Sequence, residues 1–239
     1  MIKKISDLSI KIFADGADKS KMIEMSKKSF ISGLTTNPTL MRKSGILNYK
    51  DFALSVLNKI KDKPISFEVF SDDFDEMYYQ ALEISSWAQN VYVKIPITNT
   101  KGNSSNELIK SLSEEGVKLN ITAIMTNQQV DLTLDVLNLD VCSYISIFAG
   151  RIADTGIDPL PIITKALDSM KYHKKSELIW ASPRELLNIV QADEVGCHII
   201  TVTSDILNKL NYLGYNLDKF SLDTVNMFYN DSIVAGYKI

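Results

Sequence analysis

The sequence predicts one α/β domain, a closed (β/α)₈ barrel of parallel strands, on three observations. Eight short apolar segments rich in β-branched residues recur along the 239 residues, a length that suits a single barrel of about 250. Segments with helical periodicity separate these strands, and several begin with a helix-capping signal. In several strands, one of the two alternating sides is polar. Repeated strand, loop and helix units indicate parallel pairing, because each return needs a crossover.

The predicted strands are short and bounded by turn-forming or polar residues. In chain order they are Ser9–Ala14, Phe30–Thr35, Ile65–Phe70, Val91–Ile95, Lys118–Ile124, Cys142–Phe148, Glu177–Ala181 and Cys197–Thr203.

Capping signals predict where five of the intervening helices begin. Asn37 and Asp158 each stand before a proline, which places a capping side chain ahead of the first helical position. Three segments match the capping box, in which a side chain at each end bonds the backbone of the other: Ser104–Glu107, Thr126–Gln129 and Ser182–Glu185.

An open, doubly wound sheet is the competing architecture, and the polar strand positions favour the barrel. Strands buried on both faces should be apolar throughout. Here one parity is polar in several strands, as at Glu68, Lys94, Asn120, Thr122 and Thr201, while the other parity stays apolar. One face of the closed sheet would then meet helices and the other would surround a polar interior.

The chain after the last strand predicts a short eighth helix over Ser204–Leu210 and then a C-terminal helical extension, residues 211–239, within a single domain of residues 1–239. Leu217, Phe220, Val225 and Phe228 would share one face of that helix. The face would pack either on its own barrel or on a neighbouring subunit.

Composition excludes several classes of function. With 26 basic and 29 acidic residues, the chain has a formal charge of −3, so a nucleic-acid partner is not expected. No apolar run reaches the roughly 18 residues of a membrane span, and Met1–Asp7 lacks a signal-peptide core, which favours a cytoplasmic protein. Glycine-rich phosphate loops are absent, and neither the two cysteines nor the two histidines have metal-ligand spacing, so we expect no cofactor and no metal.

Lys94 is the informative residue of the predicted interior. Burial disfavours the charged amine, and a neutral amine can attack a carbonyl to form a Schiff base. Asp15 at the end of the first strand and Glu68 in the third would supply proton acceptors and donors. The alternatives are a lysine that extends to water, a turn aspartate before Gly16, and a Glu68 that only pairs with the amine.

An anion site is the second prediction. Arg151 follows the sixth strand, and Ser182 and Arg184 follow the seventh at a predicted helix start. Free backbone N–H groups and two guanidinium groups from neighbouring loops can hold a phosphate, and this fold often binds phosphate near its late strands. A cap without a ligand and two surface salt bridges are the alternatives.

Five motifs in order resemble the signature stretches of the transaldolase family. They are Gly33–Thr39, Val93–Pro96, Leu119–Thr122, Phe148–Ile152 and Ala181–Arg184. The resemblance extends from about Ile10 to Leu207. It implies a barrel that transfers a dihydroxyacetone unit between sugar phosphates, in the pentose phosphate pathway, without cofactor or metal.

The resemblance also implies a role for each matching residue. Lys94 matches the Schiff-base lysine, Asp15 the acid/base aspartate, and Glu68 with Thr122 the pair that positions a catalytic water. Residues expected to bind the dihydroxyacetone hydroxyls or the phosphate are Asn37, Asn120, Ser146, Arg151, Ser182 and Arg184, with Phe148 beside them. Thr36 is a further binding candidate, or with Asn37 only a helix start.

The implied substrates are sedoheptulose 7-phosphate or fructose 6-phosphate as donor, and glyceraldehyde 3-phosphate or erythrose 4-phosphate as acceptor. Short family members that cleave fructose 6-phosphate carry Gln and Tyr where this chain has Glu68 and Phe148, so both positions favour transfer. A cleaving aldolase and a non-catalytic sugar-phosphate binding protein remain the alternatives. Pro183, Ile147 and Met125–Asn127 depart from the family pattern at the acceptor and phosphate ends. The resemblance further implies a homo-oligomer, of five or ten subunits.

Overall fold

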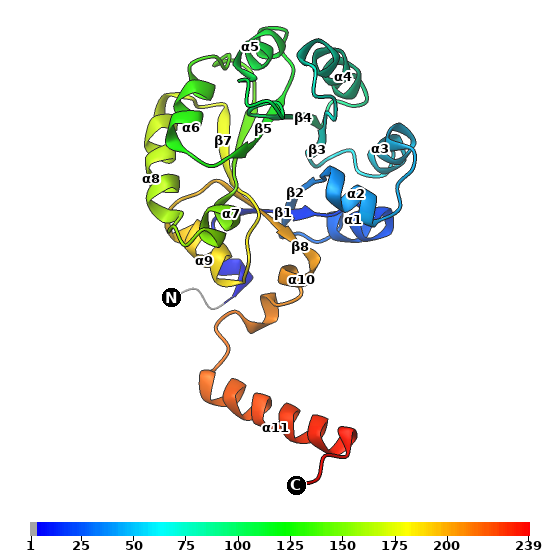
Figure 1. Ribbon diagram of the computed structural model, residues 1–239, viewed down its shortest axis with the longest axis vertical. Helices are drawn as coiled ribbons and strands as arrows, with labels where there is room; N and C mark the ends of the chain where they lie inside the picture. The colour runs from blue at the N-terminus through cyan, green and yellow to red at the C-terminus, as the bar shows by residue number, and fades with distance from the viewer. Residues whose placement is uncertain (1–3) are drawn as a thin grey trace.

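A computed structural model describes residues 4–239 of the protein, and it has a closed barrel of eight parallel strands in sequential order (Figure 1). Met1–Lys3 lie outside the described residues. They belong to the segment Met1–Asp7, from which the sequence predicts no signal peptide. The strands are β1 Lys11–Asp15, β2 Ile31–Thr35, β3 Ile65–Glu68, β4 Val91–Pro96, β5 Leu119–Ile124, β6 Ser143–Ile147, β7 Ser176–Trp180 and β8 Ile199–Thr203. The predicted barrel is therefore confirmed, and the predicted strands match within two residues at nearly every end.

Helices surround the barrel and cover its outer face (Figure 1). They are α1 Lys19–Ser26, α2 Pro38–Lys43, α3 Tyr49–Leu57, α4 Phe74–Ser86, α5 Asn106–Glu114, α6 Asn127–Leu134, α7 Ala149–Asp154, α8 Leu160–Ser169, α9 Leu187–Glu194 and α10 Ser204–Leu207. A last helix, α11 Leu217–Ala235, lies outside this ring. Short 3₁₀ turns lie at Ile5–Asp7, Met170–Tyr172 and Leu210–Tyr212. Among the described residues, no helix combines the length and the apolar character that crossing a bilayer requires.

Two apolar layers hold the barrel together. Outward strand residues such as Phe67, Val93 and Ile121 are fully buried in the main core between strands and helices. A smaller cluster closes the amino-terminal end of the barrel interior, where the Tyr144 ring meets Phe13 edge-on at 5.7 Å between ring centroids and stacks on Tyr92 at 4.0 Å. Because these rings fill the lower interior, the polar residues above them face the carboxyl ends of the strands.

Two of the predicted helix starts form as expected. Asn37 caps α2 by accepting the backbone N–H of Leu40, with Pro38 at the first helical position. Thr126 and Gln129 form the reciprocal capping box at the start of α6.

The other three predicted helix starts are wrong in detail. Ser104 accepts the N–H of Asn106, two residues along, instead of forming a box with Glu107. Asp158 similarly accepts the N–H of Leu160, and α8 begins one residue later than predicted. Both side chains bond locally two residues ahead, a turn that competes with the cap.

The predicted capping box at Ser182–Glu185 is replaced by an irregular loop. Helix α9 begins only at Leu187, and the Asn188 side chain accepts the backbone N–H groups of Arg184 and Glu185. Ser182 has φ = 60°, in the left-handed region. A capping residue has extended backbone, as Asn37 has before Pro38, and the left-handed backbone of Ser182 does not provide this geometry.

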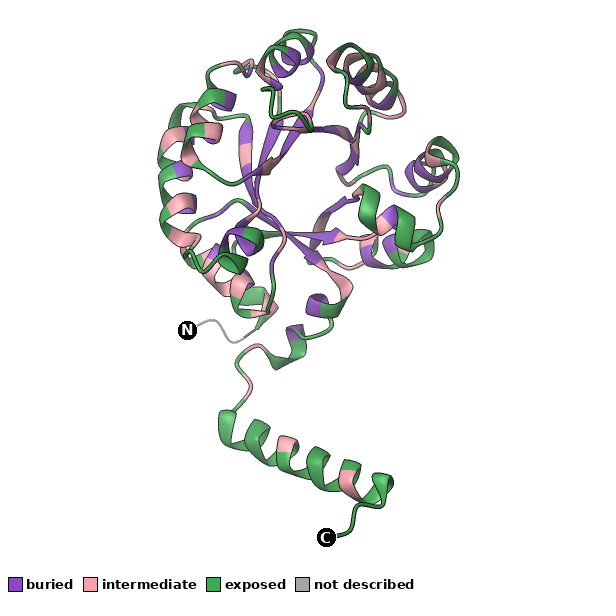
Figure 2. Cartoon of the chain, in the orientation of Figure 1, coloured by how far each residue is buried: buried purple, intermediate pink, exposed green. Residues whose placement is uncertain are grey.

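The C-terminal helix extends away from the barrel (Figure 1). None of the residues of α11 is buried, and Figure 2 shows the helix exposed along almost its whole length. Leu217, Phe220, Val225 and Phe228 are all exposed. The expectation that this face packs on its own barrel is wrong, because the turn at Leu210–Tyr212 and the loop after it direct α11 outward.

Candidate active site

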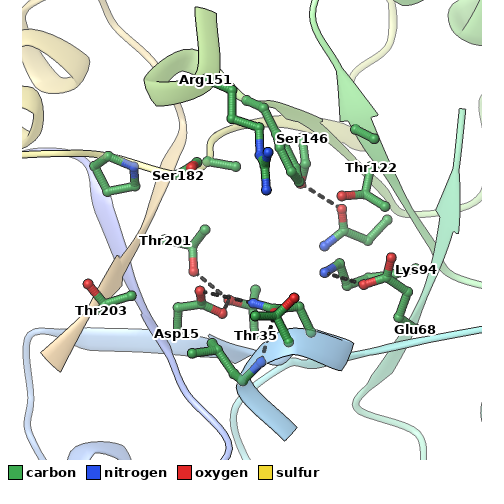
Figure 3. Close-up of a pocket in the computed structure, with 18 of the residues that line it drawn as sticks. Asp15, Thr35, Glu68, Lys94, Thr122, Ser146, Arg151, Ser182, Thr201 and Thr203 are labelled. Carbon is green, nitrogen blue, oxygen red and sulfur yellow. Dashed lines mark hydrogen bonds and ion pairs between the residues drawn. The ribbon is translucent and has the colours of Figure 1, made fainter. Parts of the chain in front are cut away.

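A cavity of about 540 Å³ opens at the carboxyl ends of the strands, where the polar interior meets the loops (Figure 3). Of the twelve predicted site residues, Thr36 alone is missing from its lining. The others are Asp15, Asn37, Glu68, Lys94, Asn120, Thr122, Ser146, Phe148, Arg151, Ser182 and Arg184. Residues up to 169 positions apart in the sequence, Asp15 and Arg184, thus share one cavity because parallel strands bring their carboxyl ends to the same edge.

Lys94 is buried on β4 and points into this cavity (Figure 3). Its Nζ atom donates hydrogen bonds to Glu68 Oε2 at 2.8 Å and to the Thr36 carbonyl at 2.9 Å. Glu68 lies opposite it because β3 and β4 pair with these two residues in register. An amine held in this way has a carboxylate within reach of its proton and one free direction toward the cavity.

Glu68 is itself held by a residue that sequence reasoning missed. The Tyr49 hydroxyl, on α3, donates to the Glu68 carbonyl and accepts the Glu68 backbone N–H, both at 2.8 Å. Burial raises the pKa of Tyr49, which keeps this hydroxyl protonated. The helix outside the barrel therefore fixes the backbone at the end of β3.

Asp15 ends β1 across the cavity from Lys94 (Figure 3). Its Oδ1 atom accepts the Thr35 hydroxyl at 2.8 Å, and its Oδ2 atom lies 3.4 Å from Asn37 Nδ2. Burial raises the pKa of Asp15, while Lys94 and the Thr35 hydrogen bond lower it. A carboxyl group in this setting is suited to accept and return a proton.

A buried amide and two hydroxyls lie between β3, β5 and β6. Asn120 Nδ2 donates to Ser66 Oγ at 3.0 Å, and Ser146 Oγ donates to Asn120 Oδ1 at 2.7 Å. All three side chains are buried. This network fixes the orientation of the Asn120 amide, and Asp15, Glu68, Lys94 and Asn120 together are called the reaction centre below.

Thr122 lies at an irregularity of β5. The pairing of β5 with β6 shifts between Ile121 and Ile124, and Ala123 there has φ = 62°. Thr122 Oγ1 is buried and has no hydrogen-bond partner within residues 4–239. A buried hydroxyl without a partner is costly, so this one is well placed to bond a water or a substrate hydroxyl.

Arg151, Ser182 and Arg184 are called the anion rim below. Arg151 stands on the short helix α7 after β6, and Ser182 and Arg184 stand on the loop after β7. The two segments touch at Gly150, where a Cβ would overlap the carbonyl oxygen of Ser182. Only glycine therefore lets them approach this closely. Arg151 is exposed, its guanidinium lies 5.8 Å from the centre of the Phe148 ring, and no carboxylate pairs with it among the described residues.

Arg184 differs from Arg151 because it already has an ionic partner. Its Nε atom donates to Asp154 Oδ1 at 2.9 Å, and its Nη2 atom donates to Asp154 Oδ2. The Arg184 guanidinium holds the pKa of Asp154 below its usual range. The prediction of a surface salt bridge thus applies to Arg184, although the residue also lines the cavity.

Thr36 does not line the cavity with its side chain, contrary to its prediction as a binding residue. The side chain is fully buried, and its hydroxyl donates to the Ser66 carbonyl at 3.1 Å. The inward parity belongs to Thr35, so Thr36 faces away from the interior. What Thr36 offers the site is its backbone carbonyl, which accepts the Lys94 amine.

Sequence reasoning passed over other residues of the cavity wall. They include Thr35, Thr201, Thr203 and Asp205. Thr201 and Thr203 carried a signal, the inward polar parity of the last strand. Thr35 and Asp205 had none beyond their neighbours in sequence.

Within residues 4–239, no group of three or more His, Cys, Asp or Glu side chains could hold a metal ion. The cationic groups that line the cavity are Lys94, Arg151 and Arg184. This composition suits a carbonyl compound that carries an anionic group.

The fold and the cavity together define a (β/α)₈-barrel enzyme with a buried, carboxylate-paired lysine at the carboxyl ends of the strands. The model of the transaldolase/fructose-6-phosphate aldolase family matches residues 12–234, and the chain belongs to this family. The family assignment predicted from five motifs is therefore confirmed.

Curated relatives agree with the family match. The chain is 35% identical over 202 residues to a probable transaldolase of Dehalococcoides mccartyi, covering 84% of this chain and 90% of that protein. It is 33% identical over 204 residues to a probable transaldolase of Methanococcus maripaludis, covering 84% and 89%. A solved structure of a putative dihydrodipicolinate synthase family protein from Coccidioides immitis has a TM-score of 0.61 at 10% identity, covering 92% of this chain and 75% of that one, which is a likeness of fold alone.

Proposed function

We propose that the protein is a transaldolase that works through a Schiff base on Lys94. It would transfer a dihydroxyacetone unit from sedoheptulose 7-phosphate or fructose 6-phosphate to glyceraldehyde 3-phosphate or erythrose 4-phosphate. The observation that carries the proposal is the buried Lys94 amine, 2.8 Å from Glu68 and facing Asp15 across a cavity with two arginines. The names of the relatives, probable transaldolase, support the same activity.

The first half of the proposed reaction forms the imine. Lys94 Nζ passes a proton to Glu68 and bonds to C2 of the ketose phosphate, giving a carbinolamine. Glu68 returns a proton to the C2 hydroxyl, and the C2–O bond breaks to release water. The nitrogen lone pair forms a double bond to C2, which gives the iminium. Thr122, whose hydroxyl is without a partner among the described residues, would hold this water near Glu68.

The second half breaks and remakes a carbon–carbon bond. Asp15 takes the C4 hydroxyl proton, the C3–C4 bond breaks, and its electron pair moves into the iminium to give an enamine. An aldose phosphate leaves. An acceptor aldehyde then reacts with the enamine, Asp15 returns its proton to the new hydroxyl, and water releases the product from Lys94.

The proposed binding residues are those whose side chains lie around the reacting groups. Asn37, Asn120 and Ser146 would hold the dihydroxyacetone hydroxyls, since their polar atoms lie beside the reaction centre. Arg151, Ser182 and Arg184 would hold the phosphate at the opposite end of the cavity. The Phe148 ring would separate the two ends.

Reductive trapping tests the proposal. Borohydride added to the protein with fructose 6-phosphate should leave a covalent adduct that peptide mass spectrometry locates at Lys94. Lys94→Met should show neither adduct nor turnover, and Lys118, the lysine at the start of the next strand, should stay unmodified. Turnover without an adduct at Lys94 would exclude the Schiff base. Equal sugar-phosphate affinity in both proteins with no turnover in either would identify a binding protein instead.

A fructose-6-phosphate aldolase is the second candidate, because the description of the matching family includes that activity. Phe148 argues against it, since a phenyl ring cannot hold a water that would release the intermediate. A transferase should produce about one equivalent of glyceraldehyde 3-phosphate per site from fructose 6-phosphate alone, and continue when erythrose 4-phosphate is added. Sustained release of free dihydroxyacetone without acceptor would favour the aldolase. Phe148→Tyr should increase that release.

We also propose that the protein is a homo-oligomer of five or ten subunits, as the family resemblance implies. The exposed apolar residues of α11, among them Phe220, Val225 and Phe228, support a contact with a second copy. Light scattering should give a mass of several chains, and Phe220→Glu with Phe228→Glu should reduce it. A monomer at micromolar concentration would contradict the proposal. The cytoplasm and the pentose phosphate pathway stay predictions from the sequence.

A further inference from the structure

We propose that Thr35 and Thr201 are positioning residues that hold Asp15 in its reactive orientation and ionisation state. This inference rests on the proposed function, in which Asp15 takes the proton of the C4 hydroxyl. It adds two residues that neither the sequence motifs nor the reaction scheme assigned. Figure 3 shows both threonines beside Asp15, joined to it by a chain of hydrogen bonds.

The chain of hydrogen bonds crosses three adjacent strands. Thr35 on β2 pairs in register with Asp15 on β1, and its hydroxyl donates to Asp15 Oδ1 at 2.8 Å. Thr201 on β8 lies in register with Phe13, one inward layer below Asp15. Its hydroxyl oxygen lies 2.5 Å from that of Thr35. Thr35 and Thr201 both line the cavity, so the chain of hydrogen bonds runs along its wall to the carboxylate.

The direction of the two hydrogen bonds follows from the chemistry of the groups. An ionised carboxylate only accepts, so the single proton of the Thr35 hydroxyl goes to Asp15. Thr35 must then accept from Thr201. Both threonine side chains are buried, and their hydroxyls bond each other. Each donor polarises the next, which strengthens the bond that Asp15 receives.

This arrangement makes the two carboxylate oxygens of Asp15 unequal. Thr35 donates to Oδ1 at 2.8 Å, whereas Oδ2 accepts only a long bond of 3.4 Å from Asn37 Nδ2 and is the oxygen with more room for a substrate hydroxyl. Thr35 thus limits rotation of the carboxylate. Correct placement of a general base accounts for a large part of its contribution to the reaction rate.

The ionisation state depends on the same contacts. The charged groups that face Asp15 are Lys94 on β4, which favours the carboxylate, and Glu68 on β3, which opposes it. Arg151 and Asp205 line the same cavity from α7 and α10, the short helices after β6 and β8. Burial raises the pKa of Asp15, and the Thr35 hydrogen bond is one of the two interactions that offset this effect.

The pH dependence of kcat/KM tests the inference. Thr35→Val keeps the shape of the side chain but removes the donor, so the acidic limb should move up by about one pH unit or more, since hydrogen bonds to charged groups are worth that much. Thr35→Ser should restore the wild-type limb. Thr201→Val should shift the limb in the same direction by less, because Thr35 can still donate, and Thr201→Ser should restore it.

Thr203 provides the matched control. It pairs in register with Asp15 on the other neighbouring strand and lines the cavity, but its hydroxyl has no hydrogen-bond partner within the described part of the chain. Thr203→Val should therefore leave the acidic limb in place. An equal shift in this variant would show a general effect of lost polarity and would overturn the inference.

Borohydride trapping separates this inference from the proposed function, because imine formation precedes the step that uses Asp15. A wild-type protein that forms no adduct at Lys94 would refute the proposed function itself. An active, trapped wild-type enzyme whose acidic limb is the same in Thr35→Val would refute this inference alone. If Thr35→Val does not fold, the Thr201→Val and Thr201→Ser pair decides, and identical limbs in those two variants would count against the inference.

Discussion

The reaction centre and the anion rim differ in how the chain holds them. Asp15, Glu68, Lys94 and Asn120 stand on strands, and each has a hydrogen-bond partner on a neighbouring strand. The anion rim stands on the short helix α7 and on the loop after β7, with an exposed Arg151 and an Arg184 paired to a surface aspartate. Register fixes the reacting groups, whereas a close backbone approach at Gly150 and one exposed ion pair hold the rim together. We infer that imine chemistry is built into the barrel, while the choice of anionic substrate depends on segments beyond the strands.

Asn120→Ala should have the largest effect, because it removes the centre of a buried network. The hydroxyls of Ser66 and Ser146 would each lose a partner, so the free energy of unfolding should fall by about 2–4 kcal/mol together with kcat. Urea unfolding and steady-state kinetics measure both quantities. Ser146→Ala removes only one of these contacts and should cost clearly less. If Asn120→Ala changed KM alone, the reaction centre would be no more firmly held than the rim.

Arg151→Met and Arg184→Met compare the rim arginine without an ionic partner with the one that is already paired. Arg151 has no carboxylate partner among the described residues, so its loss should raise KM for a sugar phosphate by about 10- to 100-fold at nearly unchanged stability. Arg184 shares its charge with Asp154 and should matter less. Fructose with glyceraldehyde as acceptor, a pair in which neither sugar carries a phosphate, serves as the control, and the KM for fructose should be unaffected. Equal KM changes for both donors would contradict a phosphate role.

Gly150→Ala tests the one rigid contact in the rim. The added methyl group would overlap the Ser182 carbonyl, so the loops must separate, at a cost of about 1–3 kcal/mol in stability and with a raised KM for phosphorylated substrates. Gly16→Ala is the matched control for stability, because its Cβ would meet no atom within 4 Å. Equal melting temperatures of the two variants would mean that the rim tolerates displacement.

Asp15→Asn should have the smallest effect on stability. Unlike the variants above, it should stabilise the protein. Burial raises the pKa of Asp15 above its ordinary value of 3.8, so the folded protein binds this proton more tightly than the unfolded chain does. The wild type therefore loses stability from this group as the pH rises above that ordinary value, and Asp15→Asn does not. The variant should be inactive and should melt a few degrees higher at pH 8, with a smaller difference near pH 4. A difference independent of pH would contradict the burial of this charge.

Sequence patterns were sufficient for the periodic signals and for two of the five predicted helix starts. The inward polar parity identified Glu68, Lys94 and Asn120, and strand pairing then places Lys94 opposite both of the others. The cap at Asn37 and the capping box at Thr126 formed as predicted, because both bonds lie within four residues.

The misses at the site have a common cause in contacts between distant segments. Thr201 meets Thr35 across 166 positions, and neither strand carries a signal for the other. Tyr49 reaches Glu68 from an outer helix. The sequence left open whether Arg184 binds an anion or forms a surface salt bridge, and the fold brings Asp154 beside it.

The sequence by itself determined the barrel and which residues face its interior, because alternation along strands and the crossover between parallel neighbours are properties of the local chain. Tertiary structure alone decided which oxygen of Asp15 is held by Thr35, which arginine is already paired, and that α11 leaves the barrel. Those outcomes depend on distances between side chains far apart in sequence, and only the closed sheet and its loops set such distances.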